Sequence, residues 1–78
     1  MNKVGDIVWT RNQMFMVDVH DPQTGEVIGL TRLGRREHVK IAAIPDDNSG
    51  ENNFTCVTST GLHFYMTRDE FDTIDDPW

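Results

Sequence analysis

Hydrophobic residues recur at every second position over several short segments of the chain, which is the period of β-strands. Residues 7–10 and 14–19 form the first two segments, and residues 26–32 follow a turn at Asp21-Pro22-Gln23-Thr24-Gly25. The proline presets the bend of this turn and the glycine tolerates a positive φ. Gly29 inside the third segment predicts a bulge or a sharp bend. The first half of the chain is therefore expected to hold three antiparallel strands.

The second half repeats the pattern over residues 39–44, 54–59 and 62–67. Pro45 ends the first of these segments, and the other two are expected to form a hairpin around Thr60-Gly61. Alternation places one set of side chains of this hairpin on a common face (Phe54, Cys56 and Thr58 across from Leu62, Phe64 and Met66) and leaves another set on the opposite face (His63, Tyr65 and Thr67).

The segment Thr67-Arg68-Asp69-Glu70 matches a capping box, so a short helix is expected to begin there. Phe71 and Ile74 of that helix would point back at the sheet. Three acidic residues would share its outer stripe: Asp69, Asp72 and Asp76. Five or six strands followed by a helical turn predict an all-β fold, either a small, strongly bent antiparallel sheet or a barrel.

The opening segment Val4-Gly5-Asp6-Ile7-Val8-Trp9 resembles the first strand of many Src-homology-3-like small barrels, in which a Gly-Asp turn precedes an apolar strand. A final Thr-x-x-Glu turn also suits that family. The resemblance covers about six residues and implies an architecture that protein-binding, peptide-binding and nucleic-acid-binding modules share. The aromatic groove of the peptide-binding members has no recognisable counterpart in this sequence.

Length and composition predict a single domain over residues 1–78. The chain has 78 residues, 37% of them hydrophobic, and folding at this size buries only about 60% of the unfolded surface, enough for one core. The longest apolar runs have four residues, far fewer than the roughly 20 that span a bilayer. With no signal-like opening, a cytoplasmic protein without membrane contact is expected. Residues 45–53 are expected to form a mobile acidic loop and residues 75–78 a tail.

Signatures of catalysis are missing from the sequence, which lacks Gly-x-Ser-x-Gly, a phosphate-binding glycine loop and His-Glu-x-x-His. Cys56, His20, His38 and His63 are possible metal ligands. The nearest pair, Cys56 and His63, is seven residues apart, unlike the closely spaced pairs of structural zinc sites. We therefore expect no enzyme, no cofactor and no metal site.

The net charge of −6 is concentrated in the second half of the chain, where eight of the 13 acidic residues follow residue 40 with one basic residue, Arg68. An acidic surface can attract the basic groove of a nucleic-acid-binding protein. In size, charge and β-rich character the chain is similar to accessory inhibitors that phages and plasmids encode against host restriction, CRISPR or transcription machinery, some of which mimic nucleic acid. The sequence thus favours a non-enzymatic protein-interaction module. Its candidate contact residues are Asp69, Asp72, Asp75, Asp76, Met14, Met16 and Trp78.

Met14 and Met16 are candidates because alternation places them, with Asp18, opposite Phe15, Val17 and Val19, so that this strand is apolar on both faces. Either the terminal helix or Trp78 covers the two methionines within the monomer, or they form a homodimer or partner interface. Trp78 itself either folds back on the domain or docks in a pocket of a partner.

The alternative function is a small nucleic-acid-binding barrel. Arg32, Arg35, Arg36 and Lys40 are four of the seven basic residues and lie on a glycine-bent loop, which suits phosphate recognition. The net charge opposes this function, because an acidic body repels a polyanion at long range. The remaining explanation is a solvated turn whose arginines pair with acidic groups of the protein itself.

Overall fold

A computed structural model describes residues 3–45 and 53–73 of the chain. Within these ranges, seven strands form one antiparallel sheet: β1 (Ile7–Thr10), β2 (Met14–His20), β3 (Val27–Leu33), β4 (His38–Ala43), β5 (Asn53–Val57), β6 (His63–Thr67) and β7 (Phe71–Thr73). A 3-10 turn, η1 (Arg68–Glu70), joins the last two strands. The all-β prediction is confirmed, with seven strands in place of five or six. In this part of the chain no helix is long and apolar enough to cross a membrane.

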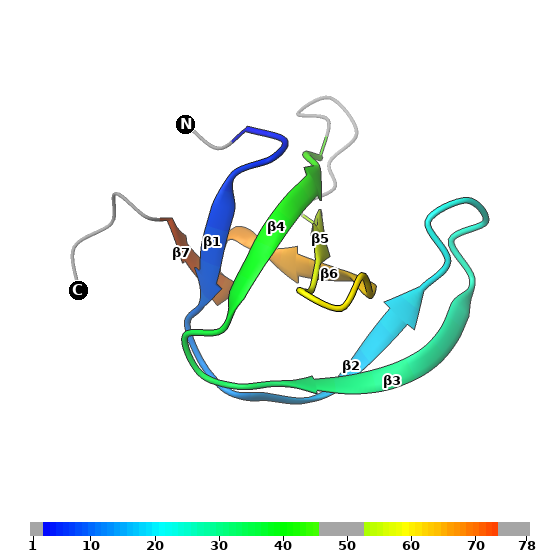
Figure 1. Cartoon of the computed structure of the whole chain (residues 1–78), viewed down its shortest axis with the longest axis horizontal. Coiled ribbons are helices and arrows are strands. Elements are labelled where there is room, and N and C mark those ends of the chain that lie inside the picture. The colour runs from blue at the N-terminus through cyan, green and yellow to red at the C-terminus, as the bar shows by residue number, and fades with distance from the viewer. Residues whose placement is uncertain (1–2, 46–52, 74–78) are drawn as a thin grey trace.

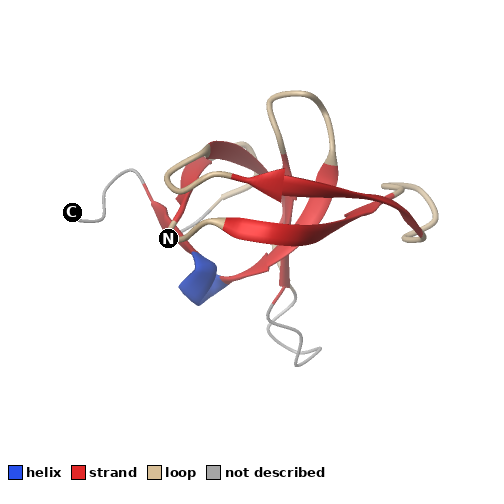
Figure 2. Cartoon of the chain, turned by 90° about the horizontal axis from the view of Figure 1, so that it is seen from below, coloured by secondary structure: helices blue, strands red, loops and turns tan. Residues whose placement is uncertain are grey.

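The order of strands in the sheet is β3-β2-β6-β5-β4-β1-β7. β1 and β2 follow each other in the chain but separate, because β1 pairs with β4 and β7 whereas β2 pairs with β3 and β6. Figure 1 shows the resulting curvature, with the β2–β3 hairpin extending away as an arm. Figure 2 shows the curved sheet from below, with η1 as the helical turn in blue. The expected barrel is not confirmed, because β3 and β7, at the two ends of the order, do not pair.

The core is formed by side chains that all seven strands turn toward the inside. The most deeply buried of these residues are Val8, Leu33, Val39, Ile41, Cys56, Phe64, Met66 and Phe71. Phe54 lies opposite Met66 and Cys56 opposite Phe64, so the predicted register of the last hairpin is confirmed. The rings of Phe54 and Phe71 meet edge to face with centroids 5.1 Å apart, which joins this hairpin to β7.

The alternation predicted for β2 is wrong at the start of the strand. Phe15 and Met16 together oppose a single residue of β3, which makes a β-bulge. The extra residue shifts the phase of the strand, so Met14 packs against the core instead of facing solvent. Phe15 is 62% exposed and Met16 is 77% exposed. Val17, beyond the bulge, is buried as predicted.

The predicted turns are present. At the tip of the β2–β3 hairpin, the Asp21 carboxylate accepts the Gln23 N–H at 2.8 Å, and the Gly25 N–H donates to the Asp21 carbonyl at 2.8 Å. Gly25 has φ 79°, a left-handed conformation that glycine adopts without strain. Gly61, between β5 and β6, has φ 91° for the same reason.

The capping box is confirmed, but the segment that follows it is a strand. The Glu70 carboxylate accepts the Thr67 N–H at 2.9 Å, and η1 begins at the next residue. After one turn the chain enters β7, where Phe71 pairs with Thr10 of β1 and is fully buried. Asp72 therefore lies on a strand, so the expected acidic helical stripe does not form. Ile74 and Asp76 lie outside the described residues, as do Asp46, Asp47 and Glu51 of the expected loop.

The side chain of Thr10 fastens the end of β1 to the turn between β3 and β4. Its hydroxyl donates to the Gly34 carbonyl at 2.5 Å and accepts the Glu37 N–H at 2.9 Å. The backbone of Thr10 also bonds to Glu37 and to the N–H of Arg36. Because Thr10 is fully buried, water cannot replace these hydrogen bonds. The base of the β2–β3 hairpin is therefore held by a buried hydroxyl group.

Replacing this hydroxyl with a methyl group in Thr10→Val should destabilise the protein by about 1–3 kcal/mol, because two partly buried hydrogen bonds, to the Gly34 carbonyl and from the Glu37 N–H, are lost. The melting temperature measured by circular dichroism should fall by about 4–8 °C per kcal/mol. Thr31→Val is the matched control, since Thr31 is a half-buried strand residue whose hydroxyl has no hydrogen bond among the described residues. Equal melting temperatures for the two variants would contradict the role given to Thr10.

Candidate functional site

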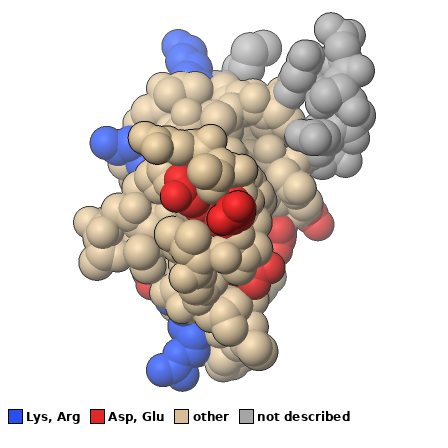
Figure 3. All heavy atoms as spheres, turned by 90° about the vertical axis from the view of Figure 1, so that its right-hand side faces the viewer, with Lys and Arg blue, Asp and Glu red and all other residues tan. Residues whose placement is uncertain are grey.

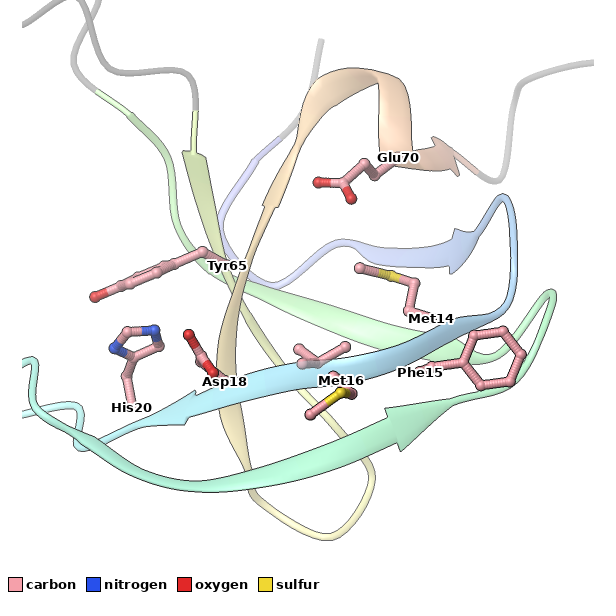
Figure 4. A pocket seen from close by; sticks show the side chains of 8 residues that line it. Met14, Phe15, Met16, Asp18, His20, Tyr65 and Glu70 are labelled. Atoms are coloured by element: carbon pink, nitrogen blue, oxygen red, sulfur yellow. The ribbon is translucent and has the colours of Figure 1, made fainter.

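A groove lies between β2 and β6, where the sheet opens. In the described structure these strands share one residue pair, His20 opposite His63, whereas β5 and β6 share five. Beyond that pair the two strands diverge around a groove of about 450 Å³. Figure 4 shows the residues that line it: Met14, Phe15, Met16, Val17, Asp18 and His20 from β2, Tyr65 from β6 and Glu70 from η1.

Two rings form one end of the groove. The ring centroids of His20 and Tyr65 are 4.3 Å apart, with 39° between the planes. Nδ1 of His20 lies 3.0 Å from the Gly25 carbonyl oxygen. Because a carbonyl only accepts hydrogen bonds, Nδ1 carries a proton and the ring is fixed against the hairpin turn. Tyr65 remains 39% exposed, so part of its surface is open to an alkyl chain or a cation.

Two carboxylates lie on opposite sides of the groove. Asp18 is exposed on β2, and within the described ranges no side chain pairs with it. Oε1 of Glu70 accepts the Thr67 N–H at 2.9 Å, which leaves Oε2 for another donor. A cationic group in the groove would therefore meet negative charge from both walls.

A second hollow adjoins the groove, and His20 and Tyr65 line both. It measures about 320 Å³ and is bounded by the hairpin turn at Asp21 and by Thr55 and His63 of the sheet. Figure 3 shows the face of the molecule on the arm side, with acidic side chains in its middle and lysine and arginine only at its margins. The centre of this face therefore carries negative charge.

The acidic residues singled out in the sequence lie apart from the groove or outside the described ranges. Asp69 is exposed on η1, and a hydrogen bond from the Thr67 hydroxyl lowers its pKa. Asp72 accepts two hydrogen bonds from Arg11, at 2.7 Å from Nη2 and 3.0 Å from Nε, so its charge is already paired. Three further candidates lie outside the described residues: Asp75, Asp76 and Trp78.

The two methionines singled out in the sequence are brought together, since both line the groove. Met14 does so while packing against the core, and Met16 does so as an exposed residue of the bulge. A flexible thioether side chain adapts to partners of different shapes. The groove therefore combines flexible methionine side chains with the carboxylates of Asp18 and Glu70.

The basic candidates occupy another region. Arg32 is the penultimate residue of β3, and Arg35 and Arg36 lie in the turn to β4, all of them exposed. Arg36 has φ 59°, a left-handed conformation that is strained for a residue with a side chain. Lys40 lies on β4 and lines a separate hollow with Ile7. Three of the four basic candidates are therefore neighbours at one turn.

No metal site is found among the described residues, because no three His, Cys, Asp or Glu side chains are grouped to hold an ion. Cys56 is fully buried, and its thiol donates to the Phe54 carbonyl at 3.8 Å. Burial raises the pKa of Cys56 to about 12, and the charge of Glu70 adds to this effect. The thiol is therefore neutral at ordinary pH and suits neither nucleophilic attack nor metal binding.

Sequence reasoning missed Asp18, His20 and Glu70 as site residues. Their meeting depends on the contact between β2 and β6, which involves segments far apart in the chain. The signal in the sequence that could have indicated this site is the alternation of β6, which places Tyr65 on the outer face beside buried Phe64 and Met66. An exposed aromatic residue on a strand face is a common feature of binding surfaces.

In the folded protein, Cys56 should react with Ellman's reagent at pH 8 at least about a hundredfold more slowly than in denaturant, because reaction requires the core to open. The exposed thiol of Ser59→Cys in a Cys56→Ala background provides the control and should react fast. Rapid modification of native Cys56, followed by absorbance, would contradict this account of a buried neutral thiol.

Comparison of the chain with protein-family models, with characterised proteins and with solved structures gives no match. The groove itself has a distinctive shape and charge. These features are an apolar wall, an exposed aromatic ring and two carboxylates around one concave surface.

Proposed function

We propose that this protein is a non-enzymatic interaction module that receives a basic segment of a partner protein in the groove between β2 and β6. The observation that carries the proposal is the combination of Asp18, Glu70 and Tyr65 in one groove. A lysine or arginine side chain matches this lining, since its alkyl stem packs on apolar residues while its charged end meets carboxylates and an aromatic ring.

The net charge of the chain supports the same kind of partner. At −6, the protein attracts a basic surface at long range and repels an acidic one. Nucleic-acid-binding proteins are a partner class with such a basic surface. The compositional similarity to phage and plasmid inhibitors favours that class, and blocking a nucleic-acid site is the corresponding mode of action.

The contact surface differs in part from the one inferred from the sequence. Met14 and Met16 remain in it, because both line the groove. Asp69 stands exposed on η1, the turn that carries Glu70, and extends the acidic rim. Asp72 is left out, since Arg11 neutralises it.

Nucleic-acid binding is the second candidate, and the observation that favours it is the exposed group formed by Arg35 and Arg36 on one turn and Arg32 on the strand before it. Phosphate contacts by such residues would release counterions and weaken steeply with salt. The acidic body of the protein opposes this function.

Asp18→Lys separates these functions. In a pull-down from cell lysate at low salt, with and without nuclease, this variant should capture at least about tenfold less partner protein than the wild type, because a like charge replaces an attractive one. Circular dichroism should show an unchanged fold, since Asp18 is exposed.

Ser59→Lys with Thr60→Lys is the control matched in net charge, at two exposed positions outside the groove, and should keep nearly full capture. Equal capture by Asp18→Lys and the wild type would refute the groove as the site. Capture that nuclease removes and Arg35→Glu abolishes would establish the nucleic-acid function instead.

A further inference from the structure

The backbone of β6 faces two neighbours, β5 on one side and β2 on the other. In an antiparallel ladder, the N–H and C=O groups of successive residues point alternately to the two sides of a strand. Just before β6, the Thr58 N–H donates to the Leu62 carbonyl at 2.9 Å, so Leu62 directs its carbonyl toward the β5 side. The regular register between β5 and β6 repeats this direction at the buried residues of β6. His63, Tyr65 and Thr67 therefore direct their backbone groups toward β2.

Tyr65 is the residue of this edge that faces the groove instead of a paired strand. On one side of it, β6 meets β2 in the histidine pair. On the other side, the Thr67 N–H donates to Oε1 of Glu70 at 2.9 Å. Continuing the register of the histidine pair would bring Asp18 opposite Tyr65, but within the described residues β2 and β6 do not pair there. The N–H and C=O groups of Tyr65 therefore point into the groove, where a bound segment can use them.

We propose, on the basis of the function proposed above, that the basic segment binds in this gap as an extended strand, antiparallel to β6 and hydrogen-bonded to the backbone of Tyr65. Addition of a strand to an open edge is a recurring way of binding peptides, in which backbone hydrogen bonds provide affinity and alternate side chains provide specificity. β6 is a better template than β2, because its five pairs with β5 run without a shift whereas β2 is bulged.

The two faces of the groove define the side chains of such a strand. Successive side chains of a strand point to opposite faces of the sheet. On the outer face they would meet Asp18 and Tyr65, which are exposed. On the inner face they would meet Met14 and Val17, which pack with the core. Lysine or arginine at every second position, separated by apolar residues, matches both faces.

Amide hydrogen exchange followed by nuclear magnetic resonance tests the pairing. In the free protein, the Tyr65 amide should exchange at least about tenfold faster than the amides of Phe64 and Met66, which face β5. The probe is the peptide acetyl-Lys-Val-Lys-Val-Lys-Val-Lys-amide at low salt. At saturation it should slow exchange of the Tyr65 amide at least about fivefold, because a backbone carbonyl of the peptide then accepts this N–H.

Two methylated peptides form a matched pair. In the antiparallel register, the residues whose side chains share the outer face with Tyr65 also direct their backbone groups toward it, and these are the lysines. Methylation of the lysine backbone nitrogens should therefore raise the dissociation constant at least about tenfold, because the hydrogen bond to the Tyr65 carbonyl is lost. Methylation of the valine backbone nitrogens keeps the same charges and should change the constant less than about threefold.

Three results would overturn the strand pairing while leaving the proposed function intact. They are equal binding of the two methylated peptides, binding of the unmodified peptide without slower exchange at Tyr65, and a Tyr65 amide that exchanges as slowly as its neighbours in the free protein. Absence of binding by the unmodified peptide would refute the proposed function and the strand pairing together.

Discussion

The β2–β3 hairpin is attached to the rest of the sheet across β6 by a single described residue pair, His20 opposite His63. Its base is also attached by the packing of Val17 and Leu33 in the core and by the buried hydroxyl of Thr10, which joins the turn after β3 to the end of β1. Apart from the one residue pair, β2 of this hairpin does not pair with β6 in the described structure. Its inner side opens the groove, and its outer side leaves β3 as a free edge.

The bulge in β2 explains how such an arm stays joined to a small core. A bulge bends its strand and changes the phase of the side chains, so Met14 packs inward while Phe15 and Met16 face outward. Val17 then returns to the core. The same local distortion therefore supplies a core contact at the base of the arm and an exposed apolar wall in the groove.

Local patterns in the sequence predicted the elements that depend on near neighbours. The hairpin of β5 and β6 has a regular register, so alternation identified its buried face. The turn at Asp21 and Gly25 and the capping box of Thr67 and Glu70 follow from short-range hydrogen bonds, and both were expected.

Features that depend on distant contacts were not predictable in the same way. The predicted faces of β2 were wrong at its start because a bulge within a run of apolar residues does not change their sequence pattern. β7 was taken for a helix because three residues carry little periodicity and their pairing with β1 is long-range. The groove was missed because it exists only where β2 meets β6, and the pairing of Asp72 with Arg11 likewise joins opposite ends of the chain.

The central claim is that the groove between β2 and β6 binds basic segments, and nuclear magnetic resonance tests it most directly. Isotope-labelled protein would be titrated at low salt with a short polylysine peptide, and with polyglutamate as the control. The account predicts saturable amide shifts concentrated at Met16, Asp18, Tyr65 and Glu70, absent with polyglutamate and in Asp18→Lys. Shifts of equal size spread over all acidic residues, or no shifts at these four positions, would contradict it.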